Sequence, residues 1–360
     1  MNLIFSAGEA SGDAYAAELA KRLQEFVLLG IGGARSSATG VQLIADSSDW
    51  GAIGIIESLK VGPRVQKGYR LATQALNELK PGVFVPIDYG FLNIQLARHA
   101  RAKGWKVLYF MPPGSWRKDK QGKDLPSVTD RIVTPFPWSA EILKEMGATV
   151  DYFGHPLAQM VQQRGAETRL DQLALLPGSR EHEIRANMPV LAKVAQELKL
   201  PVEVALAESV QDSWVADEWR KAGGDSDSLK LTRRDTYGVL LRSKAAVVCS
   251  GTATLEAALC RCPFVVVYRL SAMVALEGRI RRPKFDYIAL PNIIAGKAVV
   301  PELIDKDASA QRVVKKMEGV LSNDGEKQLA EFDQLASQIT GDDPLGQTAN
   351  CIRQLAATAE

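Results

Sequence analysis

Small and polar residues gather in one stretch of the chain, residues 250–256, that reads Ser-Gly-Thr-Ala-Thr-Leu-Glu. An apolar run typical of a buried parallel strand precedes this stretch, and a helix-forming run follows it. We expect Ser250 or Thr252 to cap the helix, and Gly251 to let backbone approach a ligand closely. Free N–H groups at such a helix start suit a phosphate or diphosphate, and Glu256 lies one turn further, within reach of a sugar hydroxyl. An ordinary strand-to-helix turn is the alternative.

A second turn of this kind follows the apolar strand predicted at 173–176 and reads Pro-Gly-Ser-Arg at 177–180. Arg180 stands where that strand meets a helix start, so its permanent positive charge is expected at the ligand-binding edge of a sheet. A guanidinium binds phosphate through two parallel hydrogen bonds. The two turns together therefore predict a diphosphate site, and an ion pair between Arg180 and Glu183 is the alternative.

The N-terminal segment also runs from a short apolar strand into a glycine-containing turn, residues 6–13, that reads Ser-Ala-Gly-Glu-Ala-Ser-Gly-Asp. Its spacing matches neither the dinucleotide-binding GxGxxG pattern nor the ATP-binding Walker pattern. Glu9, Ser11 and Asp13 nevertheless stand at the carboxyl end of a strand, where open α/β sheets bind ligands. We predict another ligand-binding turn here, with a plain turn as the alternative.

A carboxylate that could act as a general base ends the buried strand predicted at 83–88, which reads Val-Phe-Val-Pro-Ile-Asp. Asp88 would face the central crevice of a parallel sheet, a suitable place for a group that accepts a proton. A helix cap or an ion-pair partner is the alternative for Asp88. Glu9 and Asp13 are the competing candidates for the base.

The bulk composition restricts the class of protein. The 360 residues carry 44 Lys and Arg against 42 Asp and Glu, a net charge of +2, so nothing in the charge favours nucleic acid as a partner. The cysteines form no metal-type pattern and the histidines are scattered, so we expect reduced thiols, no metal and no cofactor. Asp225 and Asp227 form a DxD pattern in a polar turn, which we interpret as solvated. No segment has the pattern of a signal peptide, and none reaches the roughly 18 apolar residues that a membrane helix needs.

Strand-like and helix-like runs alternate along the chain, which predicts doubly wound parallel sheets. The length predicts two α/β domains, at residues 1–158 and 159–338, with a linker near 156–168. A last helix within 339–360 is expected to pack back on the first domain. Residues 290–296 are interpreted as an apolar loop.

Basic residues mark two further segments. The segment 112–126 combines Lys and Arg with Pro and Gly and is interpreted as a basic loop that covers an anionic substrate or is simply solvated. The segment 271–284 is apolar and basic, with Arg279, Arg281, Arg282 and Lys284. Such a stretch rests on an anionic membrane surface or packs a domain with its charged face outward.

Together these motifs resemble the lipid-A-disaccharide synthases, a family of glycosyltransferases of the two-domain GT-B type. The matching stretches occur in the family's order along nearly the whole chain: 7–13, 30–33 with Arg35 and Gly40, 54–57, 176–180 with Glu183 and Ile184, 250–256, and 290–292 with Gly296. The resemblance implies two Rossmann-like domains that face a central cleft. It also implies metal-free transfer of 2,3-diacylglucosamine from UDP to the 6-hydroxyl of 2,3-diacylglucosamine 1-phosphate, at the cytoplasmic face of the inner membrane.

The resemblance assigns roles to residues at the matching positions. The turn at 250–256 and Arg180 would hold the diphosphate, Glu256 the ribose, and Asn292 would lie near the donor. Asp88 matches the first carboxylate of the family's Ile-Asp-x-x-Asp-x-Asn segment, while Phe91 stands at its second Asp. The full set expected to bind substrate is Gly8, Ser11, Gly12, Gly178, Ser179, Arg180, Ser250, Gly251, Thr252, Ala253, Thr254, Glu256 and Asn292.

The departures from the family pattern leave other functions open. Besides Phe91, the segment 109–116 follows the family's Tyr-x-Ser-Pro-x-x-Trp pattern only loosely, and both lie on the acceptor side. Another GT-B transferase or an epimerase with a different acceptor is one alternative. A non-catalytic homologue that binds a UDP-sugar or a lipid is another. A dehydrogenase is disfavoured because no GxGxxG with a downstream acid is present.

Overall fold

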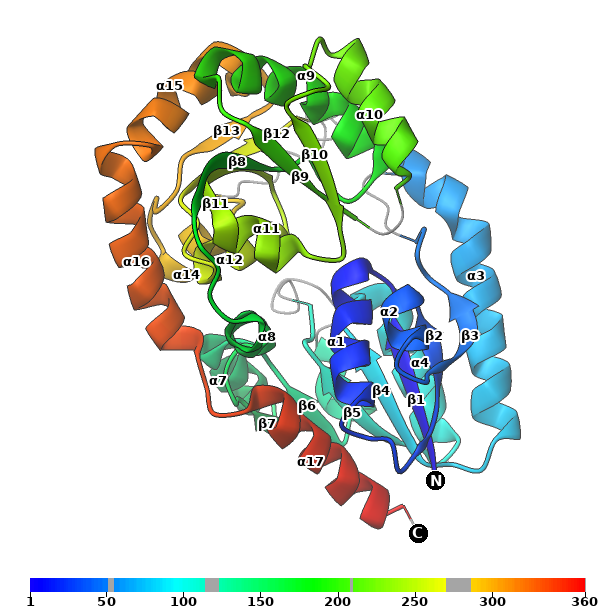
Figure 1. Ribbon diagram of the computed structural model, residues 1–360. Coiled ribbons are helices and arrows are strands. Elements are labelled where there is room, and N and C mark those ends of the chain that lie inside the picture. The colour runs from blue at the N-terminus through cyan, green and yellow to red at the C-terminus, as the bar shows by residue number, and fades with distance from the viewer. Residues whose placement is uncertain (51–54, 114–122, 208–209, 270–285, 360) are drawn as a thin grey trace. The chain divides into compact units, whose positions relative to one another are not determined.

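The computed structural model describes residues 1–50, 55–113, 123–207, 210–269 and 286–359, with only the backbone of 55–60 and 91 (Figure 1). These residues form two compact units. The first unit comprises Met1–Gln159 and Ile339–Glu360, and the second comprises Met160–Gln338. No helix in the described part of the chain is both long enough and apolar enough to cross a membrane. Each unit is built on one parallel sheet.

The sheet of the first unit has the order β3-β2-β1-β4-β5-β6-β7 (Figure 1). Its strands are β1 (Asn2–Ala7), β2 (Val27–Gly32), β3 (Gln42–Asp46), β4 (Val83–Ile87), β5 (Lys106–Phe110), β6 (Arg131–Val133) and β7 (Val150–Asp151). Neighbouring strands run parallel, and Phe5 of β1 pairs with Gly30 of β2 and Val85 of β4. The chain builds outward from β1 to β3 and then crosses to β4 on the other side of β1. The carboxyl ends of β1 and β4 therefore flank the point where the strand order reverses.

Helices cover both faces of this sheet, which explains why its central strands are apolar without alternation. The helices of the unit are α1 (Ala10–Ala20), α2 (Ala34–Ser37), α3 (Ile55–Glu78), α4 (Gly90–Ala102), α6 (Leu125–Val128), α7 (Pro137–Glu145) and α17 (Pro344–Ala357). Of these, α3 and α4 pack on one face, while α1 and α17 pack on the other. The C-terminal helix α17 contacts α1, β4 and β5. The last residues of the chain thus complete the core of the first unit.

The second unit repeats the arrangement with the order β10-β9-β8-β11-β12-β13. Its strands are β8 (Leu170–Leu176), β9 (Val202–Leu206), β10 (Leu229–Arg233), β11 (Ser243–Cys249), β12 (Phe264–Tyr268) and β13 (Glu302–Ile304). Its helical elements are α9 (Glu181–Leu198), α10 (Asp212–Lys221), α11 (Thr236–Arg242), α12 (Thr252–Leu259), α14 (Leu290–Ala295), η1 (Asp305–Asp307), α15 (Ala310–Val320) and α16 (Asn323–Ile339). The reversal point here lies between β8 and β11. The segment 290–296, predicted as a loop, contains α14, and most of the linker predicted at 156–168 is the helix α8 (Pro156–Arg164).

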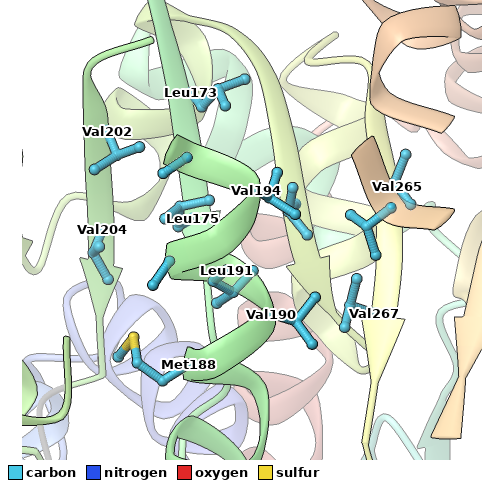
Figure 2. Packing of buried hydrophobic residues seen from close by; sticks show 14 of the residues in the cluster. Leu173, Leu175, Met188, Val190, Leu191, Val194, Val202, Val204, Val265 and Val267 are labelled. Carbon is cyan, nitrogen blue, oxygen red and sulfur yellow. The ribbon is translucent and has the colours of Figure 1, made fainter. Parts of the chain in front are cut away.

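The packing of α9 shows why this segment is helical. Its apolar residues Met188, Leu191 and Val194 recur at helical spacing and face the sheet (Figure 2). They pack in the cluster that includes Leu175 of β8 and Val204 of β9, all nearly or fully buried. This packing fixes the start of α9, and with it the turn at 177–180, relative to the strand ends.

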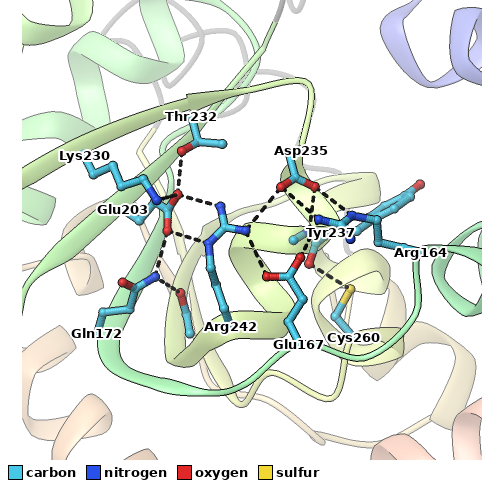
Figure 3. Close-up of polar contacts among 12 residues, drawn as sticks. Arg164, Glu167, Gln172, Glu203, Lys230, Thr232, Asp235, Tyr237, Arg242 and Cys260 are labelled. Carbon is cyan, nitrogen blue, oxygen red and sulfur yellow. Dashed lines mark hydrogen bonds and ion pairs between the residues drawn. The ribbon is translucent and has the colours of Figure 1, made fainter.

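Charged side chains form a partly buried network at the opposite, amino-terminal edge of the same sheet (Figure 3). Glu203, near the start of β9, is wholly buried and accepts two hydrogen bonds from the Arg242 guanidinium, at 2.9 and 2.6 Å. Although burial acts to raise the pKa of Glu203, hydrogen bonds led by Arg242 lower it to about 2. Arg242 also pairs with Glu167 and Asp235, and Asp235 in turn binds Arg164 of α8. The network attaches α11 and the end of α8 to the sheet, away from the edge where ligands bind.

Two segments of the first unit lie side by side, close to where the chain passes from one unit to the other. The His155 N–H donates to the Ile339 carbonyl at 2.6 Å, and the Leu345 N–H donates to Oε1 of Gln159 at 2.9 Å. Gly154 and Gly341 lie at this contact, where the backbones are so close that a Cβ on Gly341 would overlap the Phe153 carbonyl oxygen. Glycine is therefore required at position 341 for steric reasons.

We expect Gly341→Ala to lower the free energy of unfolding by about 1–3 kcal/mol, because the added methyl group must push two backbones apart. Urea denaturation followed by circular dichroism measures this change. Gly62→Ala is the matched control, because no heavy atom lies within 4 Å of a Cβ at that helical position and alanine favours a helix. Equal urea midpoints for Gly341→Ala and Gly62→Ala would contradict this expectation, because they would show that the two backbones can move apart without loss of stability.

Candidate active site

Asp88 stands directly after β4, at the reversal point of the first unit. Asp88 and the following Tyr89 both have left-handed backbones, with φ of 46° and 48°. Non-glycine residues adopt this conformation rarely, and it persists where surrounding contacts maintain it, often at functional sites. The base predicted from the sequence thus lies at the edge of the sheet where α/β proteins bind ligands.

A cavity of about 340 Å³ opens beside Asp88, within the size range of small-molecule sites. It brings together Glu9 from the β1–α1 turn and Asp88 from the β4–α4 turn. Two carboxylates therefore share one space with an aromatic ring and apolar side chains. The cavity is lined by Glu9, Val65, Asp88, Tyr89, Gly90 and Leu92.

The surroundings of Asp88 raise its pKa from 3.8 to about 6. Burial is the largest cause, because it disfavours the charged form, and the negative charge of Glu9 acts in the same direction. A hydrogen bond from the Tyr89 N–H opposes both. A carboxyl group with this pKa is largely ionised at neutral pH, yet more basic than an exposed aspartate, as a general base requires.

The glycines of the first turn serve packing. A Cβ on Gly8 would overlap the ring of Tyr89, so Gly8 leaves room for that ring beside the cavity. The same ring lies beside Trp50, with 6.2 Å between ring centroids. Gly12 is buried, and a Cβ there would lie 3.2 Å from the Cβ of Ala7, while Ser11 is partly exposed in the first turn of α1. Gly8 therefore acts on the cavity through Tyr89.

Asp13, predicted as a competing base, is hydrogen-bonded within the fold. Its carboxylate accepts hydrogen bonds from the N–H groups of Gly33 at 2.6 Å, Arg35 at 3.0 Å and Ser36 at 3.2 Å, and from the Ser36 hydroxyl. These donors form the start of α2. A Cβ on Gly33 would lie 2.9 Å from Oδ2 of Asp13, which explains the glycine there. The acceptor capacity of Asp13 is thus used within the fold.

In the second unit, the turn after β8 carries Arg180 to the start of α9. Gly178 has a φ of 126°, and a Cβ there would lie 2.7 Å from the side chain of Glu183. The buried Glu183 carboxylate accepts a hydrogen bond from the Ser179 N–H at 3.0 Å and pairs with the Arg180 guanidinium at 2.9 Å. The ion pair considered as an alternative from the sequence is therefore present, and it orients Arg180 at the helix start.

The turn at 250–252 lies beside that of Arg180, because β11 pairs with β8 and Val248 stands opposite Leu176. Gly251, with a φ of 136°, is the N-cap residue of α12, and no side chain caps the helix. The prediction that Ser250 or Thr252 caps it was wrong: the Ser250 hydroxyl donates to the Ile288 carbonyl instead, at 3.2 Å. The first N–H groups of α12, which include those of Thr252 and Ala253, have no acceptor inside the helix.

Thr254 and Glu256 occupy different surroundings in α12. Thr254 is buried, and its hydroxyl donates to the Gly251 carbonyl at 2.8 Å and accepts from the Leu290 N–H at 3.1 Å. Thr254 thus supports the turn, whereas Glu256 is partly exposed one turn into the helix. The positive end of α12 and the charge of Arg180 meet at one strand edge, a setting that favours an anion.

Asn187 of α9 joins the strand ends of this site and was not identified from the sequence. Its amide donates to the Pro177 carbonyl at 2.9 Å and accepts from the Arg269 N–H at 3.2 Å. It also contacts the sulfur of Cys249, whose pKa is raised to about 12, chiefly by burial. The one sequence signal was a polar residue on the apolar face of a helix, next to Met188.

Asn292, expected near the donor, is used within the fold. It is 1% exposed, and its NH₂ group donates to the Val300 carbonyl at 2.9 Å and to Oε1 of Glu302 at 2.8 Å. Its oxygen accepts from the N–H groups of Val299 and Val300, at 2.7 and 2.8 Å. All of the amide's hydrogen-bonding capacity is thereby satisfied, so its contribution to a site is to hold the segment around α14.

Several predictions fall outside the described residues. These are the basic stretch at 271–284 with Arg279, Arg281, Arg282 and Lys284, the central part of the loop at 112–126, the start of the 54–57 motif, and the side chain of Phe91. Across the described ranges, no group of three or more His, Cys, Asp or Glu side chains is placed to hold a metal ion.

Comparisons with known proteins agree on family and fold. The family model described as Lipid-A-disaccharide synthetase matches residues 3–348. A lipid-A-disaccharide synthase of Syntrophus aciditrophicus (strain SB) is 35% identical over 347 residues, which cover 89% of this chain and 88% of the relative.

Solved structures show the fold at much lower identity. A structure of S. aureus MnaA with UDP has a TM-score of 0.63 at 14% identity. The match covers 98% of this chain and 96% of the MnaA chain. CalG4, the calicheamicin glycosyltransferase, has a TM-score of 0.60 at 12% identity. The match covers 99% of this chain and 98% of the CalG4 chain. The chain therefore has the GT-B fold of two Rossmann-like units, as predicted.

The raised pKa of Asp88 has a consequence for stability. Because the folded pKa of about 6 exceeds the ordinary 3.8, ionisation of this carboxyl destabilises the folded state as the pH rises through this window, by up to about 3 kcal/mol. We therefore expect Asp88→Asn to raise the free energy of unfolding at pH 8 and to give little gain at pH 4. Urea denaturation at both pH values measures the difference.

The exposed Asp342→Asn variant, in the same unit, is the control and should change little at either pH. A variant at Asp88 that is less stable than the native protein at pH 8 would contradict this account.

Proposed function

The chain belongs to the lipid-A-disaccharide synthase family and is a glycosyltransferase, and from this we propose its reaction. It transfers 2,3-diacylglucosamine from UDP to the 6-hydroxyl of 2,3-diacylglucosamine 1-phosphate, with inversion at the anomeric carbon. The products are a β-1,6-linked disaccharide and UDP. One observation supports the proposal: Arg180 and the start of α12 lie at the reversal point of the second sheet, and Asp88, with its raised pKa, lies at that of the first.

The second unit binds the UDP portion of the donor. The N–H groups at the start of α12 and the guanidinium of Arg180 suit a diphosphate, and Glu256 takes the ribose. Glu183 holds Arg180 in place through its carboxylate, which also accepts a hydrogen bond from the Ser179 N–H. The S. aureus MnaA structure with UDP supports a nucleotide in a protein of this fold. These contacts stabilise the negative charge that grows on the diphosphate as the sugar departs.

The first unit binds the acceptor, and Asp88 removes the proton from its 6-hydroxyl. Attack by that oxygen on the anomeric carbon forms the new glycosidic bond while the bond to the diphosphate breaks, through an oxocarbenium-like transition state. The proton goes to Asp88, and the electron pair of the broken bond stays with UDP. Glu9 keeps the Asp88 carboxylate basic through its charge. The reaction needs no metal in this proposal.

Both substrates carry acyl chains, so we propose that the enzyme works as a peripheral protein at the cytoplasmic face of the inner membrane. Flotation with vesicles that contain phosphatidylglycerol tests this proposal, with neutral vesicles as the comparison. Protein that stays in the aqueous layer with both vesicles would contradict it.

Mass spectrometry of the products tests the reaction itself. The protein mixed with UDP-2,3-diacylglucosamine and the monosaccharide 1-phosphate should release UDP and a disaccharide 1-phosphate. Transfer only to other acceptors, or conversion of the donor without transfer, would indicate a different transferase or an epimerase. UDP binding without any product would indicate a non-catalytic homologue.

We expect Asp88→Asn to lower kcat by about 100- to 10,000-fold, because it removes the general base. Glu9→Gln should retain measurable activity and move the acidic limb of the kcat/KM profile, near pH 6, to lower pH. The direction follows because Glu9 raises the pKa of Asp88, so that its loss makes Asp88 ionise at lower pH. The kcat/KM profile of each variant from pH 4.5 to 9 provides the measurement. An acidic limb in Glu9→Gln at the same pH as in the native protein would show that Glu9 does not influence the ionisation of Asp88.

We expect Arg180→Gln to weaken UDP binding by about 10- to 100-fold, since a hydrogen bond to a charged group contributes about 1.5–3 kcal/mol. Glutamine can still donate to Glu183, so the buried carboxylate keeps a partner. Isothermal titration with UDP measures the affinity. Arg220→Gln, at an exposed position of α10, is the control and should bind UDP as the native protein does. Equal UDP affinities of Arg180→Gln and Arg220→Gln would show that Arg180 does not contribute to UDP binding.

A further inference from the structure

The left-handed backbone at Asp88 and Tyr89 needs contacts that maintain it. Both residues carry a Cβ, so neither adopts this conformation without cost. They follow one another, and both line the cavity. A change of backbone conformation here would turn both side chains, and with them the carboxylate of Asp88, in a new direction.

Three hydrogen bonds hold the backbone of Asp88. Its N–H donates to the Phe110 carbonyl at 3.1 Å. Its carbonyl accepts from the Tyr109 hydroxyl at 2.7 Å and from Nδ2 of Asn93 at 2.9 Å. The partners come from β5 and from α4, so the bonds fix both the N–H and the carbonyl of the residue from two different elements.

Asn93 also joins the two strands that flank the reversal point. Its NH₂ group is shared with the carbonyls of Ser6 and Ile87, each at 3.0 Å, and its oxygen accepts from the Ser6 hydroxyl at 2.6 Å. Asn93 is wholly buried. The end of β1, which leads to Glu9, and the end of β4, which leads to Asp88, are thus held by one side chain.

Tyr109 provides the more selective contact. Its side chain is wholly buried in the apolar cluster between the sheet and α4, where a phenylalanine would fill the same volume. Within the described part of the chain, the Tyr109 hydroxyl donates a hydrogen bond to the Asp88 carbonyl. The hydroxyl is therefore not needed to fill the core, and its contribution is the hydrogen bond to the Asp88 carbonyl.

We propose that Tyr109 and Asn93 are positioning residues, which hold Asp88 in its left-handed conformation and thereby direct its carboxylate at the acceptor hydroxyl. The proposal rests on the proposed role of Asp88 as the base. Neither residue touches the substrate. Without their bonds, the backbone of Asp88 relaxes toward an ordinary conformation, and its carboxylate leaves the position that the reaction needs.

The test compares Tyr109→Phe with Thr129→Val. Each variant removes one buried hydroxyl that donates to a backbone carbonyl at 2.7 Å in the first unit. Thr129 lies at the amino end of β6, whereas Asp88 lies at the carboxyl end of β4, so the control loses a similar bond at the opposite edge of the sheet.

We expect Tyr109→Phe to lower kcat by about 10- to 100-fold with the acceptor KM within about twofold, since small misplacement of a catalytic group has effects of this size. The acidic limb of its kcat/KM profile should move to lower pH, because a relaxed Asp88 gains solvent. Asn93→Leu, whose side chain has the same branching but no hydrogen-bonding group, should lower kcat in the same way. Thr129→Val should keep the native kcat and the native limb.

The outcomes separate the proposals. Native kcat and pH profile in Tyr109→Phe, with Asp88→Asn inactive, would overturn the positioning role and leave the base assignment standing. Native turnover in Asp88→Asn would overturn both. Equal loss of kcat in Tyr109→Phe and Thr129→Val, in proportion to a loss of melting temperature, would also overturn the positioning role, because it would show a general effect on stability.

Discussion

The reversal of strand order at one point in each parallel sheet is the constraint on which the rest of this structure depends. At that point the connections after two neighbouring strands leave toward opposite sides, so their carboxyl ends are not covered by a crossing helix. In the first unit these ends lead to Glu9 and Asp88, and in the second to Arg180 and Gly251. Every residue to which we assign a part in the chemistry follows from one of these four strand ends.

Buried polar side chains then hold the turns at the strand ends. Asn93 joins β1 to β4, and Asn187 contacts residues at the ends of β8, β11 and β12. Asn292 and Glu302 do the same for the segment around α14. Such side chains are tolerated in a core because each finds partners, and the cost of leaving one unpaired makes the local geometry unique. The turns that carry the candidate reactive groups are thereby held by hydrogen bonds within the protein.

The two candidate sites differ in whether the surroundings favour the charged form of the main ionisable residue. Burial and the charge of Glu9 both disfavour the ionised form of Asp88, as suits a group that takes up a proton. Arg180 is held by a buried carboxylate, as suits a cation that must stay in place while a charged ligand binds and leaves. The Glu203 network at the other edge of the second sheet shows the contrasting case, in which hydrogen bonds outweigh burial and the carboxylate stays ionised for structural reasons.

The sequence by itself determined the alternation of apolar strands and helices, and hence two Rossmann-like units, because burial on both faces leaves a signal in nearby residues. It also predicted that Glu9, Asp88 and Arg180 follow strands, and the structure confirms these positions, because a polar side chain directly after an apolar strand stands out locally. Only the tertiary structure decided which polar residues serve the fold. Asp13 and Asn292, predicted as site residues, use their hydrogen-bonding groups within the protein, and Tyr109 was noted from the sequence only as the start of a segment that loosely follows the family pattern. The physical reason is that a local pattern does not record which bonds a polar side chain makes after folding: the partners of Asp13 lie 20 to 23 positions away, and Tyr109 lies 21 positions from Asp88.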